Sequence, residues 1–366
     1  ADSISLNHGI GAVPSGGSLL VYPDHTTVYR LTASGPSGTS GAQARVVVTS
    51  QPDPQPEGSF GKHYQDQIPA DATLAAYAPE RFSMITGVVH DVDGNPLENV
   101  AITILDNPQY GTAHTDLDGR FSMPVEGGGS LVTVFNKPDY LEVHRRVSVP
   151  WNDVAQVAPI NMIIADPIHT VAAFNGDPQT VVSHRGSEVS DQWGTRACTL
   201  TMTGDNRAFA MDKDGQDVQE LATITVRATE YATLGSMPAE LPPNSAYTYC
   251  AEFSVDGARS VRFDKPVIAW VNNFLGFEVG EIVPSGSYDR DKGVWVPIDN
   301  GRVVRLLDTN NDGISDSLDA DGDGLADDIN ADGSYTDELT GLEDAALYAP
   351  GKTFWRMPLN LSLIHI

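Results

Sequence analysis

Residues 308–338 carry the side chains of this chain with the clearest chemical potential. They read Asp-Thr-Asn-Asn-Asp-Gly-Ile-Ser-Asp, then, from 319, Asp-Ala-Asp-Gly-Asp-Gly-Leu-Ala-Asp, and finally Asp-Ile-Asn-Ala-Asp-Gly-Ser-Tyr-Thr-Asp-Glu. Carboxylate and amide oxygens at alternate positions, followed by Gly, suit Ca²⁺, which takes about six to eight oxygen ligands at roughly 2.3–2.6 Å. The spacing therefore predicts chained calcium loops.

Two complete loops and a looser third loop follow from this register. Asp319 ends the first loop at position 12 and opens the second, so one residue could serve two ions, and Asn330 ends the second loop. In the first two loops position 7 offers a main-chain carbonyl. The third loop leaves its distal ligand open among Ser334, Thr336, Asp337 and Glu338. The predicted ligands are Asp308, Asn310, Asp312, Ile314, Asp316, Asp319, Asp321, Asp323, Leu325, Asp327, Asp328, Asn330 and Asp332.

The competing interpretation of this stretch is an acidic, solvated linker. Residues 308–344 hold thirteen Asp or Glu and no Lys or Arg, and such a charge density repels itself without a cation. Two copies in register with Gly at the same place favour calcium. No long amphipathic helices flank the loops, which argues against a helix-loop-helix site. The spacing resembles thrombospondin type 3 repeats, a family in which calcium replaces a hydrophobic core.

Composition sets the class of the protein. The chain has 366 residues, a formal net charge of −27 and many Gly (34) and Pro (24) between short apolar segments. This pattern predicts an all-β fold, with tandem β-sandwich domains followed by an Asp-rich calcium-binding loop segment. The acidic balance argues against nucleic acid and anionic membrane surfaces, which need clustered Lys and Arg. No apolar run reaches the roughly 20 residues of a membrane span.

The first half of the chain divides at a Pro-rich stretch. Residues 1–49 alternate as three or four strands and resemble part of an immunoglobulin-like β-domain. Residues 50–81 read as a Pro-rich linker that need not be packed. Residues 82–165 then show strands joined by two Asp-Gly turn signals, which predicts an antiparallel sandwich.

The stretch 87–124 carries a family resemblance. It contains Gly-x-Val-x-Asp-x-x-Gly-x-Pro-Leu-x-x-Val from Gly87, and Thr-x-x-Asp-Gly-x-Phe-x-x-Pro from Thr115. These motifs are similar to the carboxypeptidase regulatory-like (transthyretin-like) family, which implies a non-catalytic spacer. Asp116 and Asp118 could be metal ligands, but the Asp-Gly pair favours a hairpin turn.

The second half continues with β-like runs at 197–203, 221–228, 246–255, 260–271 and 294–306. The segments 263–267, 272–280 and 288–296 resemble ZU5-type β-domains, which implies one such domain over 166–306. The calcium loops are assigned to 307–339, and a capping-box pattern at Thr340 predicts a short helix that opens a further segment, 340–360. Residues 361–366 resemble a translated sequencing adapter and are taken as an artefact.

The two cysteines, Cys198 and Cys250, lie in strand-like sequence, and an extracellular setting favours a disulfide between them over two buried thiols. No nucleophile elbow, zinc-protease motif or phosphate loop is present. Glycoside hydrolysis by paired carboxylates stays open as a minor alternative.

In chain order these domains resemble the region before the YD-repeat shell of bacterial Rhs/teneurin-like proteins. The resemblance implies a secreted or cell-surface location and, as partner, a downstream YD-repeat shell absent from these residues. We therefore predict a non-enzymatic, calcium-stabilised spacer. The alternative is a carbohydrate-binding or adhesive module that recognises cell-surface glycans or proteins.

Overall fold

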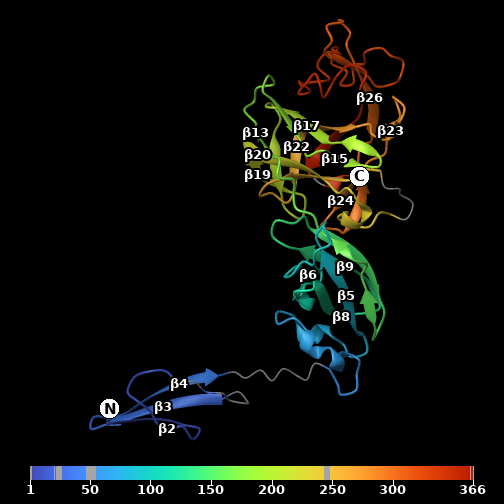
Figure 1. Cartoon of the computed structure of the whole chain (residues 1–366). Coiled ribbons are helices and arrows are strands. Elements are labelled where there is room, and N and C mark those ends of the chain that lie inside the picture. The colour runs from blue at the N-terminus through green and yellow to red at the C-terminus, as the bar shows by residue number, and fades with distance from the viewer. Residues whose placement is uncertain are drawn as a thin grey trace. The chain divides into compact units, whose positions relative to one another are not determined.

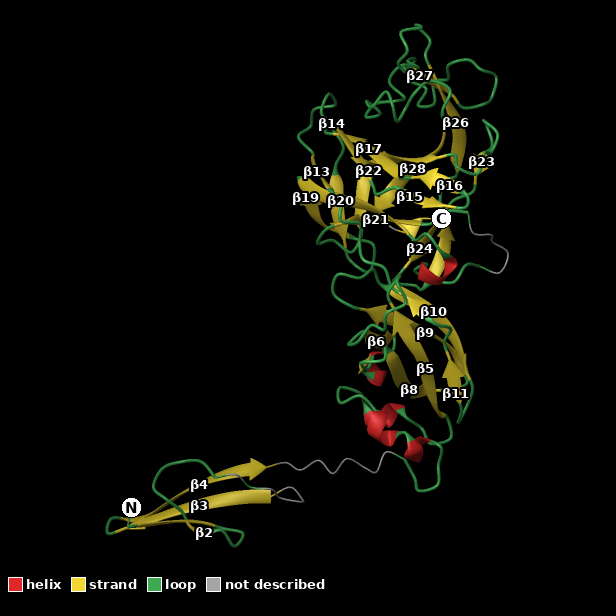
Figure 2. Ribbon diagram, in the orientation of Figure 1, coloured by secondary structure: helices red, strands yellow, loops and turns green. Residues whose placement is uncertain are grey.

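The computed structural model describes residues 2–19, 21, 27–46, 55–242, 248–362 and 364–365. In this part of the chain the regular structure is almost entirely β strand, and the helices are single 3₁₀ turns (Figures 1 and 2). The predicted all-β class is confirmed. The chain divides into two compact units, residues 1–65 and residues 66–366.

The first unit forms an antiparallel sheet in the order β2-β1-β3-β4. Four strands agree with the three or four expected from the alternating pattern. Strand β4 is exposed along both faces except at its last residue, Val46. The strands are β1 (Ser3–Leu6), β2 (Gly11–Ala12), β3 (Thr27–Gly35) and β4 (Gly38–Val46), and the 3₁₀ turns η1 (Gly61–His63) and η2 (Gln65–Gln67) follow.

The predicted linker is partly wrong. Residues 47–54 lie outside the described residues, but residues 66–81, which include η3 (Leu74–Ala76), pack against the strands that follow. The Tyr77 side chain is buried, and its hydroxyl donates to the Tyr110 carbonyl at 3.1 Å. The Thr112 backbone N–H donates to Asp71 Oδ1 at 2.9 Å. Prolines alone cannot reveal such docking, because the partner lies more than thirty residues away in sequence.

Two four-stranded sheets make up the next part, residues 82–165. One has the order β10-β9-β6-β7; in the other, β5 pairs with β8, β11 and β12. Strand β5 is parallel to both β11 and β12, so the purely antiparallel prediction is wrong. Turn signals predict local hairpins only, and these parallel pairs join segments about seventy residues apart. The elements are β5 (Phe82–His90), β6 (Ala101–Ile104), η4 (Pro108–Tyr110), β7 (Ala113–His114), β8 (Arg120–Glu126), β9 (Gly129–Asn136), β10 (Val143–Val149), β11 (Val154–Gln156) and β12 (Ile160–Asn161).

Both Asp-Gly motifs of this part form turns, but the hairpin predicted at the second motif is wrong, because the flanking strands β7 and β8 belong to different sheets. Asp116 Oδ1 accepts hydrogen bonds from the backbone N–H groups of Asp118 and Arg120, both at 2.9 Å. The carboxylate of Asp116 thus closes the turn before β8.

The second half of the chain packs a six-stranded sheet, β13-β20-β21-β29-β24-β25, against a nine-stranded sheet with the path β14-β17-β22-β28-β26-β23, which also includes β18, β19 and β27. Strands β15 and β16 form a separate two-stranded sheet. Leu200 and Trp355 from the nine-stranded sheet share one core with Val226 and Phe253 from the other. The strands are β13 (Thr170–Ala173), β14 (Val181–Arg185), β15 (Val189–Asp191), β16 (Gly194–Arg196), β17 (Cys198–Thr203), β18 (Ala208–Met211), β19 (Asp217–Leu221), β20 (Thr223–Glu230), β21 (Ala251–Val255), β22 (Val261–Asn272), β23 (Ile282–Val283), β24 (Gly286–Asp289), β25 (Val294–Pro297), β26 (Gly301–Leu307), β27 (Ser317–Asp319), β28 (Thr353–Ser362) and β29 (Ile364–His365), and the 3₁₀ turn η5 is Leu234–Ser236.

The predicted run 294–306 is two strands, β25 and β26, which belong to different sheets. The predicted domain boundaries at 307 and 340 are not domain boundaries in the structure. Strand β28 lies between β22 and β26, so the Asp-rich segment is an insertion within one sheet. Residues 361–362 and 364–365, expected to be extraneous, continue β28 and form β29.

The predicted helix from Thr340 is absent. Residues 338–341 and 345–347 form turns, with the Leu342 N–H bonded to the Leu339 carbonyl at 2.9 Å. Gly341 has a φ of +93°, which a right-handed helix cannot contain. The Thr340 hydroxyl donates to the Asp337 carbonyl at 2.6 Å instead of capping a helix.

Candidate metal centre

The three Asp-rich loops repeat one backbone conformation. Position 6 is Gly in each loop, with φ of 88°, 83° and 96° at Gly313, Gly324 and Gly333. Position 4 also has positive φ in each loop, and there the residues are Asn311, Gly322 and Ala331. Left-handed backbone is unfavourable for Ala. The third loop therefore adopts the shared backbone conformation although Ala331 is unfavourable at position 4.

The same hydrogen bonds close each loop. The carboxylate at position 1 accepts from the Gly N–H at position 6, the side chain at position 3 accepts from position 5, and the carboxylate at position 5 accepts from position 7. The position 1 residues are Asp308, Asp319 and Asp328, with distances of 2.8, 3.1 and 2.8 Å. The position 3 residues are Asn310, Asp321 and Asn330, and the position 5 residues are Asp312, Asp323 and Asp332. All three loops therefore share one local structure, and their ligand positions stay predictions.

A distal carboxylate folds back onto position 2 of each loop. Asp316 accepts from the Thr309 N–H at 2.9 Å, and Asp327 accepts from the Ala320 N–H at 2.6 Å. In the third loop Glu338 takes this place and accepts from the Ile329 N–H at 2.6 Å. Glu338, one of the four residues that the sequence left open as distal ligand, thus takes the same place in the third loop as Asp316 and Asp327 take in the first two.

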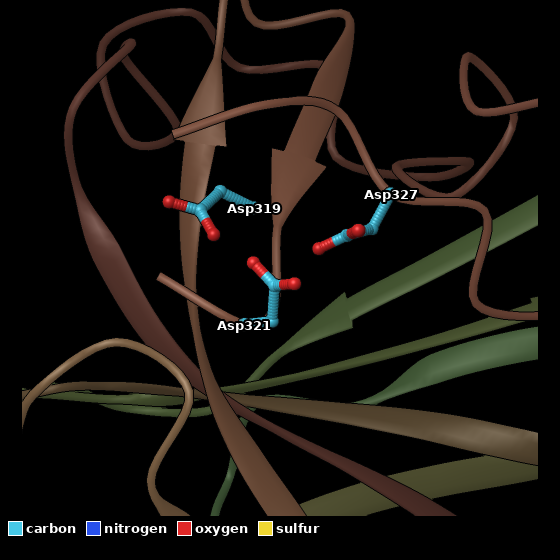
Figure 3. A group of neighbouring side chains, drawn as sticks. All are labelled: Asp319, Asp321 and Asp327. Atoms are coloured by element: carbon cyan, nitrogen blue, oxygen red, sulfur yellow. The ribbon is translucent and has the colours of Figure 1, made fainter. Parts of the chain in front are cut away.

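Acidic side chains converge in the second loop. Asp319, Asp321 and Asp327 each bring one carboxylate oxygen within 4.8 Å of the others, and Figure 3 shows the three carboxylates near one another. Asp319 is completely buried at the end of β27, while Asp321 is exposed and Asp327 is half-buried. Asp319 uses both oxygens within this loop, accepting from the N–H groups of Gly322 at 2.6 Å and Gly324 at 3.1 Å.

No short ion pair neutralises these three carboxylates among the described residues, although Arg302 and Arg356 line the same cavity as Asp321 and Asp327. Asp319 Oδ2 lies 4.0 Å from Nη1 of Arg305, which is partly exposed. Three carboxylates this close repel one another unless a cation lies between them. An all-oxygen donor set without Cys or His suits a hard cation rather than zinc. The residues present therefore fit Ca²⁺.

The remaining predicted ligands are not gathered in the same way. Among the described residues the structure brings together one group of at least three acidic, His or Cys side chains, the group in the second loop. Asp308, Asp312 and Asp316 in the first loop lie outside it, as do Asp323, Asp328 and Asp332. Asp319 accepts N–H groups of the second loop with both oxygens, and its role as a ligand shared between two ions stays a prediction. Ile314 and Leu325 have exposed side chains, and their carbonyls stay predicted ligands.

A hydrophobic base lies beneath the loops. Leu318, Leu339 and Leu342 from the Asp-rich segment are buried together with Trp270 and Phe354 from the sheet. The loops therefore rest on a hydrophobic core that they share with the nine-stranded sheet. Glu338 adds an ion pair at 3.2 Å with Arg356 of β28. The sequence analysis did not predict that the loops are attached to the sheet. The apolar residue Leu318, between two Asp-rich loops, could have indicated it.

The predicted disulfide is absent. Cys198 and Cys250 are both free, buried thiols. Cys198 lies in the core between the two large sheets, whereas Cys250 packs with Tyr231 and Tyr288 in a separate cluster. Burial raises the pKa of both thiols. Strand-like sequence around each cysteine gives no information on which core the thiol enters.

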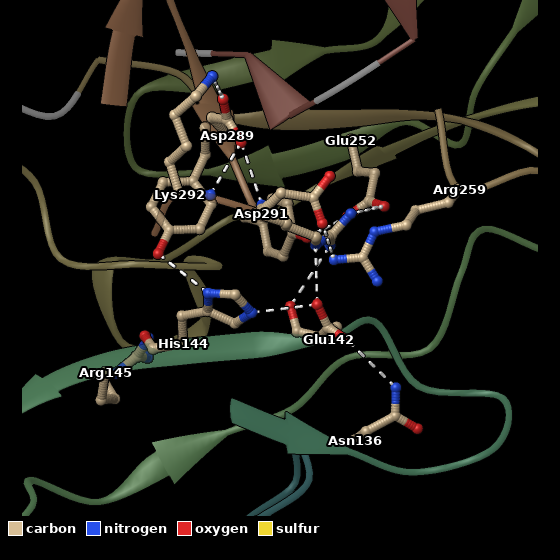
Figure 4. A network of polar contacts seen from close by, with 12 residues as sticks. Asn136, Glu142, His144, Arg145, Glu252, Arg259, Asp289, Asp291 and Lys292 are labelled. Carbon is tan, nitrogen blue, oxygen red and sulfur yellow. Dashed lines mark hydrogen bonds and ion pairs between the residues drawn. The ribbon is translucent and has the colours of Figure 1, made fainter. Parts of the chain in front are cut away.

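A second polar cluster joins residues 82–165 to the sheets that follow (Figure 4). His144 of β10 lies 3.0 Å from Glu142 through Nε2 and 3.1 Å from the Tyr288 hydroxyl through Nδ1. Arg290 Nη2 donates to Glu252 at 2.8 Å, and Arg290 Nε lies 3.6 Å from Glu142 Oε1. Burial acts to raise the pKa of Glu142, but the hydrogen bond from His144 and the charge of Arg290 outweigh it and lower this pKa to about 2. These contacts hold a carboxylate in its charged form at the junction.

Comparison with known proteins identifies one of these parts. The model of the teneurin TTR-like domain family matches residues 77–162. Human teneurin-1 is 29% identical over 110 residues, which cover 30% of this chain and 4% of teneurin-1. Mouse teneurin-3 is 30% identical over 131 residues, which cover 31% of this chain and 5% of teneurin-3. The chain thus contains a teneurin TTR-like domain and spans a small fraction of the relatives that it matches.

The predicted transthyretin-like domain is therefore confirmed, with a start at Tyr77 inside the expected linker. Among solved structures, the streptococcal ancillary pilin is 12% identical and covers 64% of this chain and 72% of its own, with a TM-score of 0.21. This likeness is too weak to bear on function. In the described part of the chain no helix is long and apolar enough to cross a membrane.

Proposed function

We propose that this chain is a non-enzymatic structural region of a secreted or cell-surface protein related to the teneurins and Rhs proteins. In this role its Asp-rich loops bind Ca²⁺ and stabilise the β-domain that carries them. The observation that carries the proposal is the convergence of Asp319, Asp321 and Asp327 around one space, with Asp319 fully buried. Removing a charged carboxylate from water is costly unless a cation or several hydrogen bonds compensate.

The two other loops support the proposal less directly. Their hydrogen bonds match those of the second loop, with position 1 accepting from position 6 at 2.8 Å in both. Since the backbone is already arranged, an ion needs only small side-chain movements to collect its ligands. We therefore propose that the first and third loops also bind calcium, more weakly than the second.

Binding free energy at such a site becomes folding free energy. An extracellular calcium module with a Kd of about 10⁻⁴ M would gain about 2.7 kcal/mol at a hundredfold excess of calcium. For a domain of this size, that corresponds to a rise of roughly 5–10 °C in Tm.

The test is thermal unfolding of the whole chain in about 10 mM CaCl₂ and in EDTA, together with isothermal titration calorimetry. We expect a higher Tm with calcium and a measurable heat of binding. Asp321→Asn removes a ligand from an exposed position and should weaken the strongest site roughly tenfold. Asp214→Asn is the matched control, because Asp214 is an exposed acid in a different Asp-Gly turn. Equal Tm in calcium and EDTA would refute the proposal.

The teneurin TTR-like match supports the wider context. In that family arrangement the β-domains precede a YD-repeat shell, and we propose such a shell as the partner of this region. Determining the gene sequence beyond the codon for Ile366 tests this: YD repeats are expected there, and an unrelated domain would remove the Rhs/teneurin context while leaving the calcium proposal intact.

A further inference from the structure

A groove of about 910 Å³ opens beside the β15–β16 hairpin. Its lining combines apolar side chains, Leu234 and Phe274 among them, with the polar residues Asp191 and Gln192. Trp193 at the tip of the hairpin also lines the groove and is 61% exposed. An indole left in solvent at the edge of a groove is a flat, partly apolar surface on which a ligand can stack.

Arg196 lines the same groove and is 2% exposed. Its Nη2 donates to Asp191 at 2.9 Å, and its Nε donates to Glu230 at 2.8 Å. The guanidinium also lies 4.4 Å from the centroid of the Phe274 ring. Within the described residues, Arg196 Nη1 has no hydrogen-bond partner although it is buried. The groove therefore has a fixed polar side chain with one donor nitrogen to spare.

Charge decides which ligand suits this arrangement. The positive charge of Arg196 is already paired with two acidic side chains, Asp191 and Glu230, and the whole chain carries a formal charge of −27. An anionic ligand would therefore be repelled by the acidic side chains beside the groove and by the net negative charge of the whole chain. A purely apolar ligand would remove water from Asp191 and Gln192 without offering them a new hydrogen bond, which is costly. A ligand with apolar faces and a rim of neutral hydroxyl groups avoids both costs.

We propose that this groove binds a neutral oligosaccharide, with one sugar ring stacked on Trp193 and its hydroxyl groups bonded by Asp191, Gln192 and Arg196. The proposal shares no residue with the Asp-rich loops and does not depend on calcium. It concerns binding without hydrolysis. Glu230, which a hydrolase would need as a second carboxylate, is held by Arg196 and does not line the groove.

The experiment titrates the whole chain with neutral hexasaccharides of glucose, mannose and xylose, and with hexagalacturonate as the anionic counterpart. Binding is followed by calorimetry and by tryptophan fluorescence, in calcium and again in EDTA. We expect at least one neutral hexasaccharide to bind and hexagalacturonate not to bind. Trp193→Ala should weaken binding by at least about tenfold.

Trp151→Ala is the matched control, because Trp151 is also 61% exposed but lies outside the groove. It should bind as the unmodified chain does. The proposal is overturned if no neutral saccharide binds, if hexagalacturonate alone binds, if the two tryptophan variants behave alike, or if new reducing ends appear. Since binding is expected in EDTA as well, failure of the calcium proposal would leave this result unchanged.

Discussion

Replacing Glu142 with Gln tests whether its charge stabilises the junction between the TTR-like domain and the following sheets. The side chain is 18% exposed, and Oε1 lies 3.0 Å from His144 Nε2 and 3.6 Å from Arg290 Nε. Glutamine keeps the size of the side chain and removes the charge. His144 and Arg290 would stay in place, and Arg290 would still be paired with Glu252.

The magnitude follows from the pKa. Burial acts to raise it, but His144 and Arg290 lower it from the usual 4.5 to about 2. Each tenfold change in proton affinity is worth about 1.4 kcal/mol, so the charged form contributes on the order of 3 kcal/mol. Because the folded-state pKa is lowered, this contribution is fully present above pH 4.5 and is lost as the pH falls toward 2.

The assay is urea unfolding of both chains at several pH values between 2 and 7, followed by tryptophan fluorescence. We expect Glu142→Gln to lower the free energy of unfolding by up to about 3 kcal/mol at pH 7 and to match the unmodified chain near pH 2. Glu220→Gln is the control, since Glu220 pairs with Arg207 on the surface and should change stability little. Equal stability of Glu142→Gln and the unmodified chain at pH 7, or an unchanged loss of stability toward acid, would refute the reasoning.

Two further predictions concern the backbone and the thiols. Ala331 has a φ of 61° at the position where the second loop has Gly322. Ala331→Gly should therefore raise the free energy of unfolding by about 1 kcal/mol, measured by urea unfolding in calcium. A lower free energy of unfolding would show that the Ala331 backbone is not strained. Cys198 and Cys250 are buried and not joined by a disulfide. Without reductant, Ellman's reagent should therefore detect almost no thiol in the folded chain and two thiols per chain after unfolding. If no thiol reacts after unfolding, the two cysteines form a disulfide.

Much of the local structure could be predicted from the sequence. The alternating runs became strands and the Asp-Gly pairs became turns. The repeated Asp-rich sequence gives a repeated loop structure, with the same hydrogen bond at Gly313, Gly324 and Gly333. These features depend on residues only a few positions apart. Their signals therefore lie in short stretches of sequence.

Long-range pairing could not be predicted in the same way. The parallel partners of β5 and the place of β28 between β22 and β26 bring together segments far apart in the chain. Nothing local to 353–362 distinguishes an inner strand of the preceding domain from the first strand of a new one. The groove at Trp193 was missed for the same reason, because Phe274 and Leu234 reach it from other parts of the sequence.

The place of the Asp-rich segment changes what calcium could do for this protein. As a free connector, the segment would only stiffen itself when it binds the ion. Instead, β27 pairs with β26, and Leu318 is buried against Trp270 and Phe354 of the sheet. Asp319 directly follows Leu318, so an ion held by its carboxylate would stabilise the pairing and the core at the same point. Calcium bound there would strengthen the nine-stranded sheet as well as the loops, because the two share a core.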